Sequence, residues 1–172
     1  MNNNVATTFL VILDLDYTIW PFWADTHVTP PFTIKNKNSN NQITISDSVG
    51  YEIKLYPEIL SILEKAKKEG IRIGTVSRTQ EPGYARQLLK LFDLPKYFVA
   101  TEFDTGPKVK SIEKIAKSIG ISGGVKNCIL FDDESRNIND IERAGGTGIL
   151  VDDRRGLTME VFEKGINIMR KK

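Results

Sequence analysis

Cysteine and histidine are almost absent from this chain of 172 residues, which contains one of each, Cys128 and His27. A single cysteine excludes an intramolecular disulfide and a cysteine-based zinc cluster, and His27 has no second histidine with which to share a metal. This composition is typical of a reducing compartment, so we expect a cytoplasmic or nuclear protein. Cys128 lies in an apolar run and is expected to be buried and inert.

A strong excess of charge and long apolar runs are also missing. The chain has 24 Lys and Arg against 22 Asp and Glu, a net charge of +2. This balance gives no electrostatic reason to expect a nucleic acid or a membrane surface as a partner. The first apolar run reaches Asp14 far short of a membrane span, and no basic leader precedes it. We expect a soluble, unexported protein and favour a monomer.

The length predicts one domain over residues 1–172, because a domain usually takes about 100 to 200 residues. Short apolar runs typical of buried strands occur at 9–13, 71–76, 97–100, 128–131 and 148–151. Helical spacing occurs at 57–69, 82–92, 108–119, 135–144 and, with a glycine inside it, at 158–169. This alternation predicts an α/β fold, a three-layer, doubly wound (Rossmann-like), mostly parallel sheet.

The segment 17–56 interrupts this alternation and is interpreted as an insertion without helical spacing. Weak alternation at 43–45 and 51–55 predicts a small β-hairpin beside the main sheet. The stretch 35–42 reads KNKNSNNQ and has few apolar groups, so we expect a mobile loop tip there. The insertion therefore predicts a minimal cap at most, and no second domain.

Polar residues follow the predicted strands where ligands bind in open α/β sheets, at the carboxyl ends. They are Asp14 and Asp16 after the first run, Ser77 and Arg78 after the second, Asp132 and Asp133 after the fourth with Asn137 beyond, and Lys108 before a predicted helix. Four aspartates gathered at one sheet edge repel one another and need a counterion. Their oxygen ligands, together with a substrate phosphate, favour Mg²⁺. Ser77 and Lys108 can hold the oxygens of a phosphoryl group brought to the metal.

The spacing of the first two aspartates allows a division of labour. Asp14, at the rigid end of a strand, can attack phosphorus and form an aspartyl phosphate. Asp16, in the following loop, can protonate the leaving oxygen and later deprotonate the attacking water.

These motifs resemble those of the haloacid dehalogenase superfamily of phosphotransferases. Asp14-Leu15-Asp16-Tyr17-Thr18 resembles its first motif, DxDxT. Ser77, Lys108 and the pair Asp132-Asp133 resemble its second, third and fourth motifs in the same order. The run DLDYTIWPFWADTHVTPPF from residue 14 to 32 resembles the eukaryotic magnesium-dependent phosphatase family in particular. The similarity covers roughly residues 9–151.

The resemblance implies a Mg²⁺-dependent phosphomonoesterase in which Asp14 is the nucleophile and a metal ligand. Asp16 is then the acid and base and gives its main-chain carbonyl to the metal. Asp133 completes the metal site, with Asp132 and Asn137 outside the ligand shell, although Asp132 stays open as an alternative ligand.

The family also implies which residues contact the substrate and what that substrate is. Contacts are implied for Leu15, Ser77, Arg78 and Lys108. An open site with a minimal cap admits phosphotyrosine-like groups, sugar phosphates or phosphorylated protein.

Each residue also has a plainer interpretation. An isolated D-x-D pair is typical of a turn or a helix cap, and Arg78 is as well explained by a surface ion pair as by phosphate contact. A phosphate-accepting receiver uses similar groups, but in another order, with the acidic pair first and the lysine last. A catalytically quiet binding module is a further alternative. A carbon–halogen or phosphonate-cleaving relative is disfavoured, since it does not need the acid Asp16.

Tyr17, Trp20, Phe22 and Trp23 form an aromatic group whose role the sequence leaves open. It can line the mouth of the site and stack on an aromatic leaving group. We favour the alternative, that the group packs the insertion onto the sheet. For His27 we expect a structural role, near the mouth or away from it.

Overall fold

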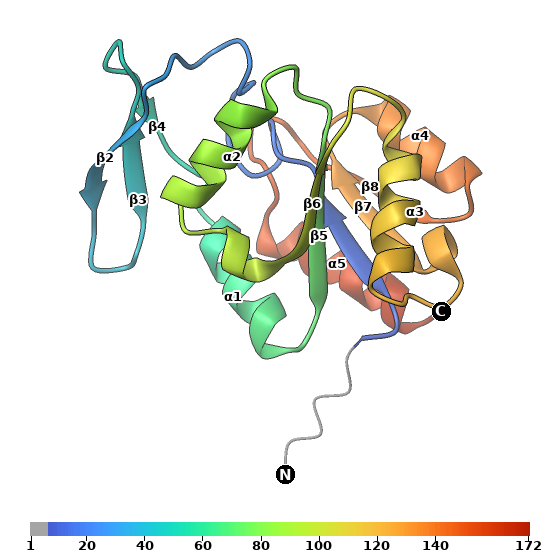
Figure 1. The fold of residues 1–172 in the computed structure, drawn as a ribbon. Coiled ribbons are helices and arrows are strands. Elements are labelled where there is room, and N and C mark those ends of the chain that lie inside the picture. Colours follow the sequence, from blue (N-terminus) through green and yellow to red (C-terminus); the bar gives the residue numbers. More distant parts are fainter. Residues whose placement is uncertain (1–6) are drawn as a thin grey trace.

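The computed structural model describes residues 7–172, and a five-stranded parallel sheet runs through its centre (Figure 1). Across the sheet the strands are β6 (Phe98–Phe103), β5 (Arg72–Ser77), β1 (Leu10–Leu13), β7 (Cys128–Asp132) and β8 (Thr147–Leu150). The helices are α1 (Ile59–Lys68), α2 (Pro82–Leu91), α3 (Lys108–Ser118), α4 (Ser135–Arg143) and α5 (Met159–Arg170). The predicted α/β fold is confirmed. None of the helices in this range is long and apolar enough to cross a membrane.

The central strand β1 shows why the sequence folds into three layers. All four of its side chains are fully buried, and successive ones point to opposite faces of the sheet. Leu10 and Ile12 join the apolar core beneath α3 and α4, whereas Val11 and Leu13 join the core beneath α1, α2 and α5. A parallel sheet covered on both faces therefore needs strands that are apolar throughout.

Gly165, which interrupts the apolar spacing of α5, lies where this helix crosses β7. A Cβ atom at this position would come within 2.5 Å of the Phe131 ring and 2.8 Å of the Ile129 side chain. The glycine lowers the intrinsic helix propensity of α5, but it allows the helix to approach the sheet closely. The close packing of α5 on the sheet thus explains Gly165, a residue that by its helix propensity alone would argue against a helix here.

The segment between β1 and α1 forms a second, antiparallel sheet beside the main one, seen at the left of Figure 1. It comprises β2 (Thr33–Lys37), β3 (Ile43–Ser46) and β4 (Glu52–Ile53). The predicted hairpin is confirmed as β3 and β4, but the prediction of a loop over 35–42 is wrong for its first three residues. They belong to β2, an exposed edge strand whose Lys37 pairs with Ile43 through the backbone ladder. Edge strands need no apolar side chains and commonly carry lysine.

Asp47 fastens the turn between β3 and β4 to the chain that follows His27. Its carboxylate accepts hydrogen bonds from the main-chain N–H groups of Thr29 (3.0 Å), Val49 (3.0 Å) and Tyr51 (2.8 Å). Burial alone would raise the pKa of Asp47, but the N–H groups of Thr29, Tyr51 and Val49 outweigh it and hold the pKa below its ordinary value. The ionised carboxylate therefore stabilises the folded protein.

Asp47→Asn is expected to lower the free energy of unfolding at pH 7 by about 2 kcal/mol, the scale of a hydrogen bond to a charged group. Because the folded pKa is depressed, the carboxylate's contribution is present above the unfolded pKa of about 3.9 and is lost as the pH falls through the folded value. The difference from the parent protein should therefore shrink below pH 4. Urea denaturation at pH 7 and pH 3, with Asp140→Asn at a half-buried position as control, measures this. An equal difference at both pH values would contradict the role of the charge.

Candidate active site

The carboxyl ends of β1, β5 and β7 open into a cavity of about 260 Å³. Asp14, Ser77, Lys108 and Asp133, which come from four different loops or strand ends, all line it. The sheet order places β1 between β5 and β7, so three of the predicted motifs meet at the centre of one sheet edge. This is the crevice in which open α/β sheets bind ligands.

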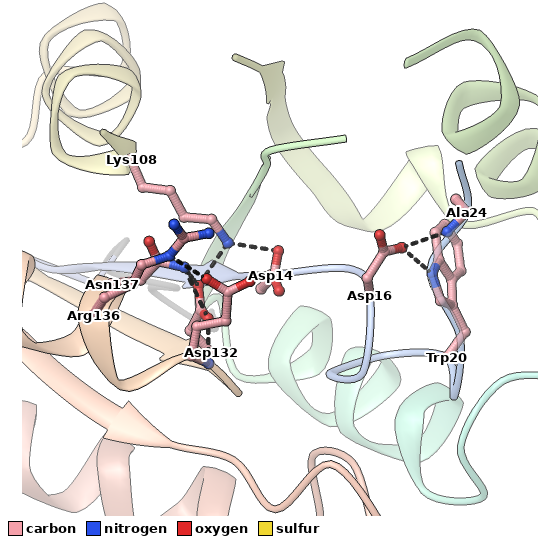
Figure 2. A network of polar contacts seen from close by, with 9 residues as sticks. Asp14, Asp16, Trp20, Ala24, Lys108, Asp132, Arg136 and Asn137 are labelled. Atoms are coloured by element: carbon pink, nitrogen blue, oxygen red, sulfur yellow. Dashed lines mark hydrogen bonds and ion pairs between the residues drawn. The ribbon is translucent and has the colours of Figure 1, made fainter. Parts of the chain in front are cut away.

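A buried charge cluster forms the floor of this cavity (Figure 2). The Lys108 Nζ atom lies 2.6 Å from a carboxylate oxygen of Asp14 and 2.6 Å from one of Asp132. All three residues are buried, and Asp132 is completely inaccessible. A charged side chain that is buried away from water needs a partner of opposite charge. Lys108, the first residue of α3, provides one for both carboxylates.

Asp132 is enclosed by further hydrogen bonds. The Asn137 Nδ2 atom lies 3.1 Å from both of its carboxylate oxygens, and the main-chain N–H of Glu134 donates to Oδ1 at 2.8 Å. Asp133 differs, because it is half-buried and lines the cavity. Within residues 7–172 the buried Asn137 Oδ1 atom has no hydrogen-bond partner. These contacts hold the Asp132 carboxylate in place, whereas Asp133 stays accessible from the cavity.

The carboxylates at the floor suit a divalent metal ion. Asp14, Asp132 and Asp133 each offer an oxygen within 4.8 Å of the others, and hard oxygen ligands favour Mg²⁺. Burial raises the pKa of Asp14 well above its ordinary value; Lys108 opposes this rise and Asp132 adds to it. Burial, followed by the charge of Asp132, raises the pKa of Asp133 to about 6. Lys108 alone leaves the cluster short of positive charge, and a divalent cation would offset that shortage.

Asp16 lies apart from this cluster and is held by other groups. Its Oδ1 atom accepts hydrogen bonds from the Trp20 Nε1 atom (2.7 Å) and the Ala24 main-chain N–H (3.2 Å). Figure 2 shows its carboxylate on the far side of Asp14 from Lys108. Burial, opposed by the bond from Trp20, raises the pKa of Asp16 to about 6, which suits an acid and base near neutral pH. Asp14 and Asp16 thus have the separate environments that a division of labour requires.

Residues 7–172 match the model of the family described as Acid Phosphatase. The chain belongs to this family. It is 40% identical to Magnesium-dependent phosphatase 1 of Homo sapiens over 162 residues, which cover 94% of this chain and 87% of that protein. It is 35% identical to a HAD-like hydrolase superfamily protein of Schizosaccharomyces pombe over 156 residues, 86% of this chain and 87% of that one.

The solved structure of a HAD-superfamily hydrolase from Geobacter sulfurreducens has the same fold, with a TM-score of 0.63 at 14% identity. The alignment covers 98% of this chain and all of that one. The resemblance to the haloacid dehalogenase superfamily and its magnesium-dependent phosphatases is therefore confirmed, and this member is a phosphatase. The expected cofactor, Mg²⁺, agrees with the name of the human relative and with the oxygen ligands at the cavity floor.

The aromatic residues of this phosphatase divide into two groups. Trp20 and Phe22 are buried and stack on each other, with ring centroids 5.4 Å apart, as expected for packing the insertion onto the sheet. That interpretation is wrong for Trp23, whose side chain is 49% exposed and lines the cavity. Trp23 stacks on His27 at 5.1 Å and donates its main-chain N–H to the His27 Nδ1 atom at 3.0 Å. His27 thus supports Trp23 from beside the cavity, and Tyr17 packs edge-on against Trp23.

The residues predicted to contact substrate lie in different settings. Ser77, buried at the end of β5, lines the cavity. Arg78 lines it too, at a half-buried position, and donates to the Thr105 carbonyl at 3.1 Å. The Leu15 side chain is fully buried in the apolar core, so its main chain is the part that can reach a ligand.

Sequence reasoning assigned no role to three charged residues of the cavity wall, Asp25, Glu134 and Arg136. Asp25 accepts a hydrogen bond from the main-chain N–H of Gln80 at 3.1 Å and so joins the loop after β1 to the loop after β5. Glu134 directly follows the acidic pair, and Arg136 lies two residues further along the chain. Their position beside that motif was a usable signal, but their residue types alone are ordinary at a helix start.

Proposed function

We propose that this phosphatase is a phosphomonoesterase in which Asp14 carries the phosphoryl group as an aspartyl phosphate. The observation that supports this most is the position of Asp14 at the end of β1. Its carboxylate is fixed by Lys108 at 2.6 Å, lies among the acidic groups suited to a metal, and lines the cavity. A carboxylate nucleophile must be held in one orientation toward phosphorus and must be accessible to the substrate. The position of Asp14 meets both requirements.

The reaction proceeds in two displacements. A carboxylate oxygen of Asp14 attacks phosphorus, forming a new O–P bond while the bond to the ester oxygen breaks. Asp16 gives its proton to that leaving oxygen, which departs as an alcohol or phenol. Asp16 then takes a proton from a water molecule that attacks the aspartyl phosphate, which releases inorganic phosphate and restores the Asp14 carboxylate.

Mg²⁺ would be held by the carboxylates of Asp14 and Asp133 and by the main-chain carbonyl of Asp16. When bound, it supplies the positive charge that lets an anionic nucleophile approach an anionic phosphate. Asp132, tied to Lys108 and Asn137, keeps its neighbours in place from outside the ligand shell.

The phosphoryl oxygens are held on the side away from the leaving group. Lys108 and Ser77 contact them from the cavity wall, together with the main chain near Leu15. Arg78 reaches them from the rim.

We infer that the substrates are phosphotyrosine-like groups, sugar phosphates or phosphorylated protein. The exposed ring of Trp23 beside the cavity supports an aromatic leaving group, since aromatic rings gain from stacking. The exposed rim also leaves room for a leaving group larger than the phosphate itself.

Hydrolysis of p-nitrophenyl phosphate by the purified protein, with Mg²⁺ and with excess chelator, tests the proposal. We expect turnover with Mg²⁺, a loss of at least about a hundredfold with chelator, and recovery when Mg²⁺ is restored. Circular dichroism in both conditions controls for unfolding. Turnover that persists in excess chelator would contradict the requirement for Mg²⁺. A folded, metal-loaded protein without turnover, or one that stays phosphorylated, would favour a binding module or a receiver.

A further inference from the structure

Three basic side chains line the cavity, and their settings differ. Lys108 is buried at the floor, where two carboxylates hold its ammonium group. Arg78 is bonded to a main-chain carbonyl. Arg136 lies at the rim, with a side chain that is 60% exposed, and its Nε atom is 2.5 Å from a carboxylate oxygen of Glu134. Figure 2 shows its guanidinium group on the same side of the site as Lys108.

Arg136 stands in an unfavourable position for a cation. It is the second residue of α4, and the N-terminal end of a helix carries partial positive charge. Glu134, at the N-cap position of this helix, makes no capping hydrogen bond with its side chain and pairs with Arg136 instead. An exposed ion pair contributes at most about 1 kcal/mol, so the stability of α4 does not account for Arg136. Residues that break local rules in this way are expected at functional sites.

Arg136 shares the cavity with a second cation, Lys108, from a neighbouring helix. α3 and α4 contact each other, and the first turn of each, carrying Lys108 and Arg136 respectively, lines the same cavity. Two helix N-termini and two cations thus face one space. In the proposed function Lys108 is taken by the transferred phosphoryl group, whereas Arg136 is engaged by a carboxylate of its own chain. An anionic ligand would have to compete with that carboxylate, which belongs to Glu134.

We propose that Arg136 forms a second anion-binding subsite, which recognises a carboxylate or a second phosphate on the leaving group of the substrate. The anionic group displaces the Glu134 side chain and binds the guanidinium, whose planar fork matches carboxylate and phosphate oxygens. The inference rests on the proposed function, and it narrows the substrate class to phosphomonoesters with an additional negative charge.

The test compares phenyl phosphate, 4-carboxyphenyl phosphate and 1,4-phenylene bisphosphate in the parent enzyme and in Arg136→Gln. We expect the variant to lower kcat/KM for the two charged substrates, relative to phenyl phosphate, by about five- to tenfold, mainly through KM. Glu134→Gln, which removes the internal competitor, should move the same ratio upwards. Arg143→Gln, at an exposed position on the same helix, is the matched control and should leave the ratio unchanged.

The two charged substrates identify the source of the anion. A larger drop with 4-carboxyphenyl phosphate assigns the subsite to carboxylates, and a larger drop with the bisphosphate assigns it to phosphate. Equal ratios in Arg136→Gln and in the parent enzyme, for both substrates, would overturn the subsite.

A binding measurement separates failure of the subsite from failure of the proposed function. Tryptophan fluorescence, with Trp23 at the cavity, follows the binding of phenylphosphonate and 4-carboxyphenylphosphonate, neither of which needs to be hydrolysed. Suppose that Arg136→Gln weakens the binding of 4-carboxyphenylphosphonate selectively, and that no phosphate ester is hydrolysed. This result would support the subsite and contradict the proposed phosphomonoesterase activity. If the esters are hydrolysed and the selectivity of Arg136→Gln is unchanged in both assays, the phosphomonoesterase activity would be supported and the subsite contradicted.

Discussion

Asp14→Asn is expected to reduce the turnover of p-nitrophenyl phosphate by at least about 10⁴-fold, because the amide cannot attack phosphorus as the carboxylate does. Steady-state kinetics with saturating Mg²⁺ measure the loss. Asp140→Asn, the same change at a half-buried site on α4 outside the cavity lining, should retain full activity. A folded Asp14→Asn protein with normal turnover would contradict the assignment of the nucleophile.

The same variant should keep its fold, which makes the kinetic result interpretable. Lys108 has a second carboxylate partner, Asp132, at 2.6 Å, and this contact is expected to remain in the variant. Burial raises the folded pKa of Asp14, so its contribution to stability is present at low pH and is lost as the pH rises through the folded value. At pH 7 and without metal, Asp14→Asn should therefore melt at the same temperature as the parent protein or higher. A large fall in Tm would contradict this account of the charge cluster.

Asp16→Asn is expected to slow the hydrolysis of an alkyl phosphate by about 10² to 10⁴-fold, the usual contribution of a general acid and base. The asparagine keeps an oxygen that can accept from Trp20 and Ala24, so the loop should retain its conformation. With p-nitrophenyl phosphate the first displacement needs little protonation, because nitrophenolate is a good leaving group. The second displacement still needs the base, so the aspartyl phosphate should accumulate.

Rapid mixing of Asp16→Asn with p-nitrophenyl phosphate should therefore release one equivalent of nitrophenolate in a burst, followed by a slow steady state. Alkyl phosphates should give no burst. Equal slowing of both substrate types without a burst would contradict the two-step role of Asp16. Acid quenching and mass measurement of the burst species, with Asp14→Asn as the negative control, would locate the phosphoryl group.

The main sheet could be predicted because its residues carry a strong and local signal. The four residues of β1 are apolar on both faces, which a covered parallel strand requires and a half-exposed strand does not. β2 carries no such signal. Its side chains are exposed, and its conformation is set by backbone pairing with β3, a contact that side-chain composition does not encode.

The part of the candidate site that lies within the sequence motifs could be predicted. The motifs bring Asp14, Lys108 and Asp133 to one cavity because parallel strands end at the same edge. They do not distinguish Trp20 from Trp23, two tryptophans three residues apart, one buried and one at the mouth. That difference depends on how the loop after β1 turns to place Trp20 against Asp16, which follows from tertiary packing.

The attachment of the small sheet through Asp47 also bears on how such an enzyme can change its substrates. Asp16 is held by hydrogen bonds from Trp20 and Ala24. These residues precede Thr29 and Asp47, whose hydrogen bond fixes the small sheet. Among residues 7–172 the insertion lines the cavity through Trp23, Asp25 and Thr26. Substrate selectivity can therefore change at these residues while the small sheet stays in place, because Ile45 and Ile53 are buried in the main apolar core.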